Sequence, residues 1–239
     1  MTNTSQTPAI HLLTRTLGSW EVTLRRHPLN RAQAVRQYDA AGASWHSALA
    51  RLGVPGAYGA LWHDILASEM PAPGPLRVLD CGIGTGAFSE AFAANAGTPV
   101  RIDGIDLSPV MLREADARLG ATVGADLQLG DVRSLQAPGG AYDITGAAHL
   151  LEHLGDPAEG LAEMMRVTRP GGLVVACLTR AGLPGSLISM RWRTHLFTPA
   201  TALLLFEAAG LRDVRVRPLG AGWPGRLSLA VTGRTPMES

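Results

Sequence analysis

The amino-acid sequence predicts an α/β fold: a seven-stranded mixed sheet of five parallel strands and an antiparallel C-terminal hairpin, preceded by a helical N-terminal lid. Three observations predict it. From Leu76 onward, short apolar runs alternate with helical patterns, which is typical of a parallel sheet covered by helices. The first apolar run opens into a glycine-rich loop, VLDCGIGTGAF (78–88). Residues before Pro71 show helical periodicity without a strand pattern.

The first half of the sheet is predicted from two apolar runs and the helix starts beside them. Strands are expected at Leu76–Asp80 and Val100–Leu107, with a helix from Ala87 to Ala96 between them. Ser108 and Pro109 begin the next helix, because serine is a favoured N-cap and proline a favoured first helical residue.

The middle of the sheet follows the same alternation. A third strand is expected at Asp126–Val132 and a fourth at Tyr142–Ala148, after a Pro-Gly-Gly turn. A helix opens at Asp156 and ends at Arg169–Gly172 (RPGG), and Leu173–Thr179 forms a fifth, buried strand.

The C-terminal part is predicted to close the sheet with an edge hairpin. A helix over Pro199–Ala209 stops at Gly210, a residue typical of helix C-termini. The β-like runs Leu211–Leu219 and Leu227–Thr235 then flank the turn-rich segment GAGWPG.

The chain divides at a proline-rich linker, Pro71–Pro75. Residues 1–70 form the expected helical cap or lid, and residues 71–239 the expected catalytic domain. At 239 residues the chain is long enough for both to share one structural unit.

Composition excludes several functions. The formal charge of +1, from 21 basic and 20 acidic residues, argues against a nucleic-acid partner. The sequence has no lysine, so Schiff-base chemistry and a phosphate-loop lysine are excluded. No run approaches the roughly 20 apolar residues of a membrane span, and the start lacks a signal pattern, so we expect a cytoplasmic protein without stable membrane insertion. The sequence does not predict an oligomeric state.

Charged or polar side chains follow each of the first four strands. Asp80, Asp106 and Asp131 end the first three, and His149 follows the fourth. Ligands of open α/β sheets bind outside the carboxyl ends of the strands, so these residues are expected to share one site with Gly82, Gly84 and Gly86. Glycines there let the backbone approach a ligand closely.

Two families of adenosine-containing ligand fit this site. The loop matches GxGxxA, with Ala87 in the last place, so a nicotinamide or flavin dinucleotide is one alternative. Asp106 can hold ribose hydroxyls in either family. Asp131, at the third strand, suits the exocyclic amine of adenine.

The chain resembles the class I S-adenosylmethionine-dependent methyltransferases, in particular the type-11 group of quinone and small-molecule enzymes. The resemblance rests on VLDCGIGTG, IDGIDLSPVMLREA, LGDVRSL, YDITGAAHLLEHLGDP and MMRVTRPGGLVV, and YDAAGASWH (38–46) is similar to the lid motif of this group. It implies a Rossmann-like methyltransferase fold and S-adenosyl-L-methionine as the cofactor.

The resemblance also implies roles for individual residues. Around the methionine end and ribose of the cofactor it places Asp80, Cys81, Gly82, Gly84 and Asp106. Around the adenine it places Leu107, Met111, Asp131 and Val132. At the methyl group it places Ala148 and His149, with Tyr38 and Trp45 closing over the cofactor.

The histidines of HLLEHL are interpreted without a metal. His149 and His153 lie four residues apart, yet HEXXH is not formed and a third ligand at a suitable spacing is missing from the sequence. His149 is the expected proton acceptor, and His153 is interpreted as a packed or capping residue beside the substrate. The two cysteines, Cys81 and Cys177, lack a CxxC spacing and are read as small buried apolar residues.

The segment 185–199 lies where acceptor-binding insertions occur in this fold. Arg191 and Arg193 are candidates for an anionic acceptor, and Trp192 and Phe197 for an apolar one. His195 is the second candidate for a proton acceptor. A solvated arginine pair on a packed helix is an equally good interpretation.

We therefore expect a methyltransferase that acts on a small, partly apolar acceptor by in-line methyl transfer. A quinone or a lipid headgroup is the alternative acceptor. The alternatives of another class are a nicotinamide-dependent oxidoreductase and a non-catalytic adenosylmethionine-binding module.

Overall fold

The computed structural model describes residues 10–27, 29–69, 74–120 and 124–237. Most of the predicted linker Pro71–Pro75 lies outside them. Among the residues that the structure describes, no helix combines the length and the apolar character that crossing a membrane takes.

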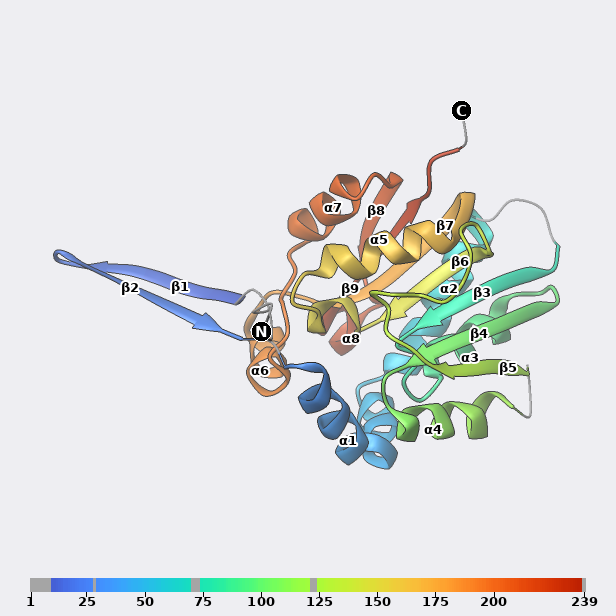
Figure 1. The fold of residues 1–239 in the computed structure, drawn as a ribbon, viewed down its shortest axis with the longest axis horizontal. Coiled ribbons are helices and arrows are strands. Elements are labelled where there is room, and N and C mark those ends of the chain that lie inside the picture. Colours follow the sequence, from blue (N-terminus) through green and yellow to red (C-terminus); the bar gives the residue numbers. More distant parts are fainter. Residues whose placement is uncertain (1–9, 28, 70–73, 121–123, 238–239) are drawn as a thin grey trace, which may run out of the picture.

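A seven-stranded sheet forms the centre of the molecule, in the order β5-β4-β3-β6-β7-β9-β8 (Figure 1). Its strands are β3 (Leu76–Cys81), β4 (Val100–Asp106), β5 (Ala125–Leu129), β6 (Tyr142–Ala148), β7 (Thr168–Thr179), β8 (Arg212–Pro218) and β9 (Ser228–Arg234). The pairs from β5 to β7 are parallel, and β9 runs antiparallel to both β7 and β8. The predicted fold class, a mixed sheet with an antiparallel C-terminal hairpin, is confirmed.

The described residues form eight α-helices and one 3₁₀ turn. They are α1 (Arg31–Arg51), α2 (Val54–Glu69), α3 (Ala87–Asn95), α4 (Pro109–Leu119), the 3₁₀ turn η1 (Leu151–His153), α5 (Pro157–Val167), α6 (Leu183–Trp192), α7 (Pro199–Ala208) and α8 (Gly222–Leu227). The N-caps of α4 and α5 are the predicted ones: Ser108 accepts from the Met111 N–H, and Asp156 accepts from the Ala158 N–H.

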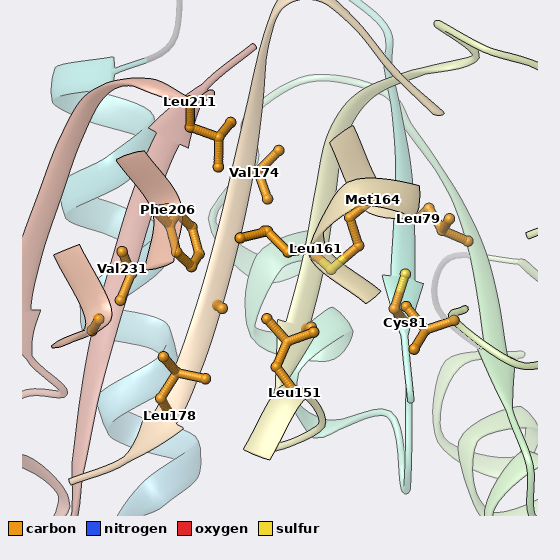
Figure 2. Close-up of a cluster of buried hydrophobic side chains, with 14 of the residues drawn as sticks. Leu79, Cys81, Leu151, Leu161, Met164, Val174, Leu178, Phe206, Leu211 and Val231 are labelled. Atoms are coloured by element: carbon orange, nitrogen blue, oxygen red, sulfur yellow. The ribbon is translucent and has the colours of Figure 1, made fainter. Parts of the chain in front are cut away.

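The alternation of side chains along β7 divides the core into two layers. Val174, Ala176 and Leu178 face α5 and α7, where they pack with Met164 and Phe206 (Figure 2). The intervening residues face α2 and α3, whose Trp62, Phe88 and Phe92 form the second layer. Burial on both faces explains why this strand reads as a continuous apolar run in the sequence.

The N-terminal segment departs from the prediction. Residues 10–26, expected to be helical, form a two-stranded hairpin of β1 (Ile10–Leu17) and β2 (Trp20–Arg26), which projects from the body of the molecule (Figure 1). Gly18, at φ 63°, takes the left-handed conformation of the tight two-residue turn. The strand signal was present in the alternating Thr14 and Thr16 before Gly18 and the alternating Trp20 and Val22 after it, so the helical interpretation was wrong there.

Two smaller differences follow from local pairing. β7 begins at Thr168, earlier than the predicted Leu173, because Thr168 pairs with Tyr142 and RPGG forms an irregularity inside the strand. The predicted third strand stops at Leu129, so Asp131 lies in the turn after β5.

Candidate functional site

A deep cleft opens at the carboxyl ends of β3 to β6. The space between its walls, counted out into open solvent, is about 1240 Å³. The start of α1 covers one side. The lining residues are Leu29, Asn30, Arg31, Ala34, Val35, Tyr38, Tyr58, Gly82, Gly84, Ile105, Asp106, Leu107, Ser108, Met111, Gly130, Asp131, Val132, Arg133, Ala148, His149, Leu150, His153, Leu154 and Gly155.

The glycine loop after β3 forms the floor of the cleft. Gly82 and Gly84 have φ values of 67° and 54°, in the left-handed region that favours glycine. A Cβ on Gly82 would lie 2.8 Å from Leu150 Cδ1, so a side chain cannot be placed there without displacing Leu150. At Gly84 the nearest atom is 3.9 Å away, and the absent side chain leaves space for a ligand against the backbone.

Asp106, at the end of β4, faces the cleft with both carboxylate oxygens held. Oδ2 accepts from the Gly84 N–H and Oδ1 from the Ser108 N–H, each at 2.9 Å. Burial raises the pKa of Asp106, although these backbone bonds oppose the shift. Each oxygen keeps a lone pair for a further donor, and two oxygens side by side match the two hydroxyls of a ribose.

Asp131 forms an ion pair that the sequence analysis missed. The guanidinium of Arg133 donates to it twice, Nε to Oδ1 at 3.0 Å and Nη2 to Oδ2 at 2.7 Å. This pairing lowers the pKa of Asp131. Oppositely charged side chains two residues apart in a turn can form an ion pair. The sequence Asp-Val-Arg alone does not show whether its two charged residues pair with each other.

Asp80 and Cys81 lie beneath the loop and are not among the residues lining the cleft. Cys81 is fully buried in the core layer of Figure 2. Asp80 is 2% exposed; Ser89 Oγ donates to its Oδ2 at 2.6 Å, while Oδ1 has no hydrogen-bond partner within the described chain. Burial raises the pKa of Asp80 to about 7.

The raised pKa of Asp80 predicts a pH-dependent stability. From pH 4 to 7 an unfolded chain ionises this carboxyl while the folded chain keeps it protonated, so its contribution to the free energy of unfolding falls as pH rises. Asp80→Asn should therefore gain more than about 1 kcal/mol relative to the unsubstituted protein on going from pH 5 to pH 8. Urea unfolding at both values, with the exposed Asp126→Asn as control, measures this; a gain independent of pH would contradict it.

His149 enters the cleft from the turn after β6. Its φ of 58° is unusual for a residue other than glycine, and its backbone N–H donates to the Cys177 carbonyl at 2.8 Å. The imidazole Nδ1 lies 3.0 Å from Glu152 Oε1, and Nε2 lies 3.4 Å from Ser228 Oγ. Glu152 is a residue that the sequence analysis did not select.

Tyr38 of α1 and His153 close the same end of the cleft. The Tyr38 hydroxyl and His153 Nε2 are 2.6 Å apart, and burial lowers the pKa of His153 to about 4, so its ring is neutral at neutral pH. Trp192 stacks against Tyr38 with a centroid distance of 5.0 Å. The helix around Trp45 is described but the Trp45 side chain lies outside the described part, so its expected contact stays a prediction.

The structure scatters the other candidates of segment 185–199. Phe197 packs in the core, His195 lies behind η1 with its backbone N–H on the Glu152 carbonyl, and neither lines the cleft. Arg191 lies over the Trp192 ring, 5.8 Å from its centroid, and Arg193 ends α6 in a left-handed conformation at φ 52°. Both arginines are exposed, which matches the interpretation of a solvated pair.

The donors and spaces of the cleft fit S-adenosylmethionine. Asp106 offers acceptor oxygens that would suit a ribose, and the open backbone at Gly84 leaves space beside it. Leu107, Met111 and Val132 line the cleft together with the Asp131 carboxylate, where an adenine would fit. Ala148 and His149 line it at the end of β6.

Comparisons with known proteins agree with this assignment. Residues 78–172 match a family model described as a methyltransferase domain. The chain is 36% identical over 115 residues to a demethylmenaquinone methyltransferase of Deinococcus radiodurans, covering 48% of this chain and 47% of the relative. It is 34% identical over 117 residues to a ubiquinone/menaquinone biosynthesis C-methyltransferase of Bdellovibrio bacteriovorus, covering 48% and 49%.

A solved structure shows the same fold. A methyltransferase dependent on S-adenosylmethionine from Thermotoga maritima aligns with a TM-score of 0.63 and 15% identity, over 84% of this chain and 99% of that one. The matches to the curated relatives above span about half of their length. S-adenosylmethionine is accordingly the cofactor of the matched domain, as predicted. Over residues 78–172 the family model, together with the fold and the cleft, supports a class I S-adenosylmethionine-dependent methyltransferase domain.

Proposed function

We propose that this chain transfers a methyl group from S-adenosylmethionine to a small, partly apolar acceptor by in-line displacement. The observation that carries the proposal is the single cleft that holds Asp106, the open glycine loop and the His149 imidazole together. The cofactor supplies a methyl group activated on a sulfonium, which an acceptor lone pair attacks as the neutral thioether leaves. The chain's own task is to align the acceptor and exclude water.

The residues at the His149 end indicate the character of the acceptor. Tyr38, Leu150 and Leu154 line the cleft with apolar surface beside the polar His149 and His153. The buried Trp192 packs behind Tyr38 and does not line the cleft. Such a combination accommodates an apolar ring with a polar or acidic substituent. The names of both curated relatives refer to a quinone, which supports a quinol or phenol acceptor for this chain; a lipid headgroup is the second candidate.

Two measurements test the proposal. Calorimetric titration with S-adenosylhomocysteine should show binding, whereas NADH should not bind. A screen of quinols, phenols, amines, thiols, lipid headgroups and short nucleic acids with radiolabelled cofactor should then show transfer to a small molecule. Methylation confined to nucleic acid would overturn the acceptor class, and binding without turnover on every acceptor would favour a non-catalytic module.

We further propose that α1 acts as a lid over the cofactor. Tyr38 joins α1 to η1 through His153, and the Ser108 hydroxyl at the cofactor side donates to Asp39 of the same helix. Cofactor binding should order this helix and exclude water from the sulfonium.

Limited trypsin digestion measures the ordering of the lid. Because the chain has no lysine, cleavage occurs only at arginines, and Arg31 and Arg36 report on α1. S-adenosylhomocysteine should slow cleavage at both several-fold, while Arg15 in the projecting hairpin serves as the internal control. Equal rates at Arg31 and Arg36 with and without the ligand would contradict lid closure.

A further inference from the structure

Glu152 is a buried carboxylate whose role the proposed function does not explain. Its side chain is 1% exposed, and Oε1 accepts from three donors: His149 Nδ1 at 3.0 Å, the Thr179 N–H at 3.1 Å and Thr179 Oγ1 at 2.8 Å. Burial opposes the charge on this carboxyl, yet the bonds from His149 and Thr179 and the nearby imidazoles lower its pKa below the usual value. The carboxylate is therefore ionised at neutral pH.

These contacts determine the tautomer of His149. An ionised carboxylate only accepts hydrogen bonds, so Nδ1 must carry the proton that it shares with Glu152. In the neutral ring Nε2 then holds the lone pair. The neighbour of Nε2 is Ser228 Oγ, a buried hydroxyl that can donate to it weakly at 3.4 Å. The His149 side chain itself lines the cleft and is 19% exposed.

The backbone holds the ring in the same orientation. His149 keeps a left-handed φ because its N–H is bonded to Cys177 of β7, and Glu152 is bonded to Thr179 two residues further along that strand. Strained conformations of this kind persist where the surroundings over-determine them, and they concentrate at functional sites. Both partners of the pair are thus fixed to one rigid strand.

We propose that Glu152 is the positioning residue that makes His149 Nε2 a general base, and that the acceptor is a weak acid whose methylated group must lose a proton. The inference rests on the proposed function. The acceptor's O–H proton passes to Nε2, and its bonding electrons stay on the acceptor. They form the new bond to the methyl carbon, either at that oxygen or, in a hydroquinone, at a conjugated ring carbon that afterwards loses its own proton to solvent. The imidazolium lies against the Glu152 carboxylate and later releases its proton to water.

This geometry distinguishes between acceptor classes. Phenols and hydroquinones gain nucleophilicity when a proton is removed, so they profit from the pair. Tertiary amines and thioethers already have a free lone pair and would not need it. Burying the Glu152 carboxylate costs free energy. An enzyme that methylated only tertiary amines or thioethers would have no need of this buried pair.

The tautomer can be measured without an acceptor. In protein labelled with ¹⁵N at its histidine side chains and saturated with S-adenosylhomocysteine, the neutral His149 ring should show a protonated Nδ1 and an unprotonated Nε2; the His149→Gln spectrum assigns the signals. Glu152→Gln should keep this tautomer, because the amide oxygen still accepts, whereas Glu152→Met should shift the proton to Nε2. Glu163→Gln, which alters a carboxylate bonded to Arg166 far from the ring, is the matched control and should change nothing.

Kinetics separate positioning from a structural role. On the best phenol or hydroquinone of the acceptor screen, Glu152→Gln should lower kcat at least about tenfold with little change in KM for the cofactor, and should move the acid limb of the kcat/KM profile to lower pH. An unchanged rate and profile in Glu152→Gln, a protonated Nε2 in the unsubstituted protein, or transfer only to tertiary amines or thioethers would each overturn the inference. If S-adenosylhomocysteine does not bind at all, the proposed function itself fails, so the two failures are distinguishable.

Discussion

Asp106→Ala is expected to lower the affinity for S-adenosylhomocysteine about 100-fold or more. Hydrogen bonds to a charged acceptor contribute about 1.5–3 kcal/mol each, and two ribose hydroxyls would lose theirs together. The loss would be compounded because the carboxylate also holds the Gly84 and Ser108 N–H groups. Calorimetric titration measures the change.

Two variants control for indirect effects on the loop. Asp106→Asn keeps the shape and one carbonyl oxygen and should lose less affinity than the alanine variant. Asp126→Ala removes a half-exposed carboxylate of the neighbouring strand β5 that does not line the cleft, and should bind normally. An affinity in Asp106→Ala equal to that of the unsubstituted protein would disprove the assignment of the ribose site.

His149→Ala is expected to lower kcat by about 10²–10⁴-fold, the usual contribution of a general base, while leaving affinity for S-adenosylhomocysteine nearly unchanged. We expect kcat to change without the affinity because the two residues lie apart in the cleft. His149 lies at the end of β6 and Asp106 at the end of β4, with β3 between these strands. Steady-state rates on an acceptor from the screen, with calorimetry on the same preparations, provide both quantities. His63→Ala, a histidine exposed on α2, is the matched control. A rate that persists in His149→Ala would leave alignment as the whole of the mechanism.

The parallel part of the fold could be predicted because its signals are local. β6 has the expected bounds, and the helices after it and after β4 begin at the predicted caps Asp156 and Ser108. The positions of Asp106 and His149 could also be predicted, because the carboxyl ends of parallel strands meet at one edge whatever the intervening sequence.

The features that could not be predicted from the sequence depend on contacts between residues far apart in the chain. Glu152 owes its role to Thr179, 27 positions away, and this pairing has no counterpart in the residue spacing. Phe197 was predicted to contact the acceptor because its sequence neighbours are aromatic and basic. In the structure a backbone β-bridge to Arg180 holds this segment so that the Phe197 side chain packs in the core. The hairpin over residues 10–26 was missed for another reason: helical periodicity further along the cap was extended over a segment whose own pattern is that of strands.

The position of β9 has a consequence for how the protein forms during synthesis. β9 lies between β7 and β8 in the sheet, and β8 pairs with it. β8 precedes β9 in the chain, so it is synthesised before the strand with which it pairs. Until β9 has left the ribosome, the edge of β7 has unpaired backbone groups on the side where β9 will pair. Such edges can recruit other strands. Completion of the sheet therefore waits for β9, which joins β7 and β8 only after both have been made.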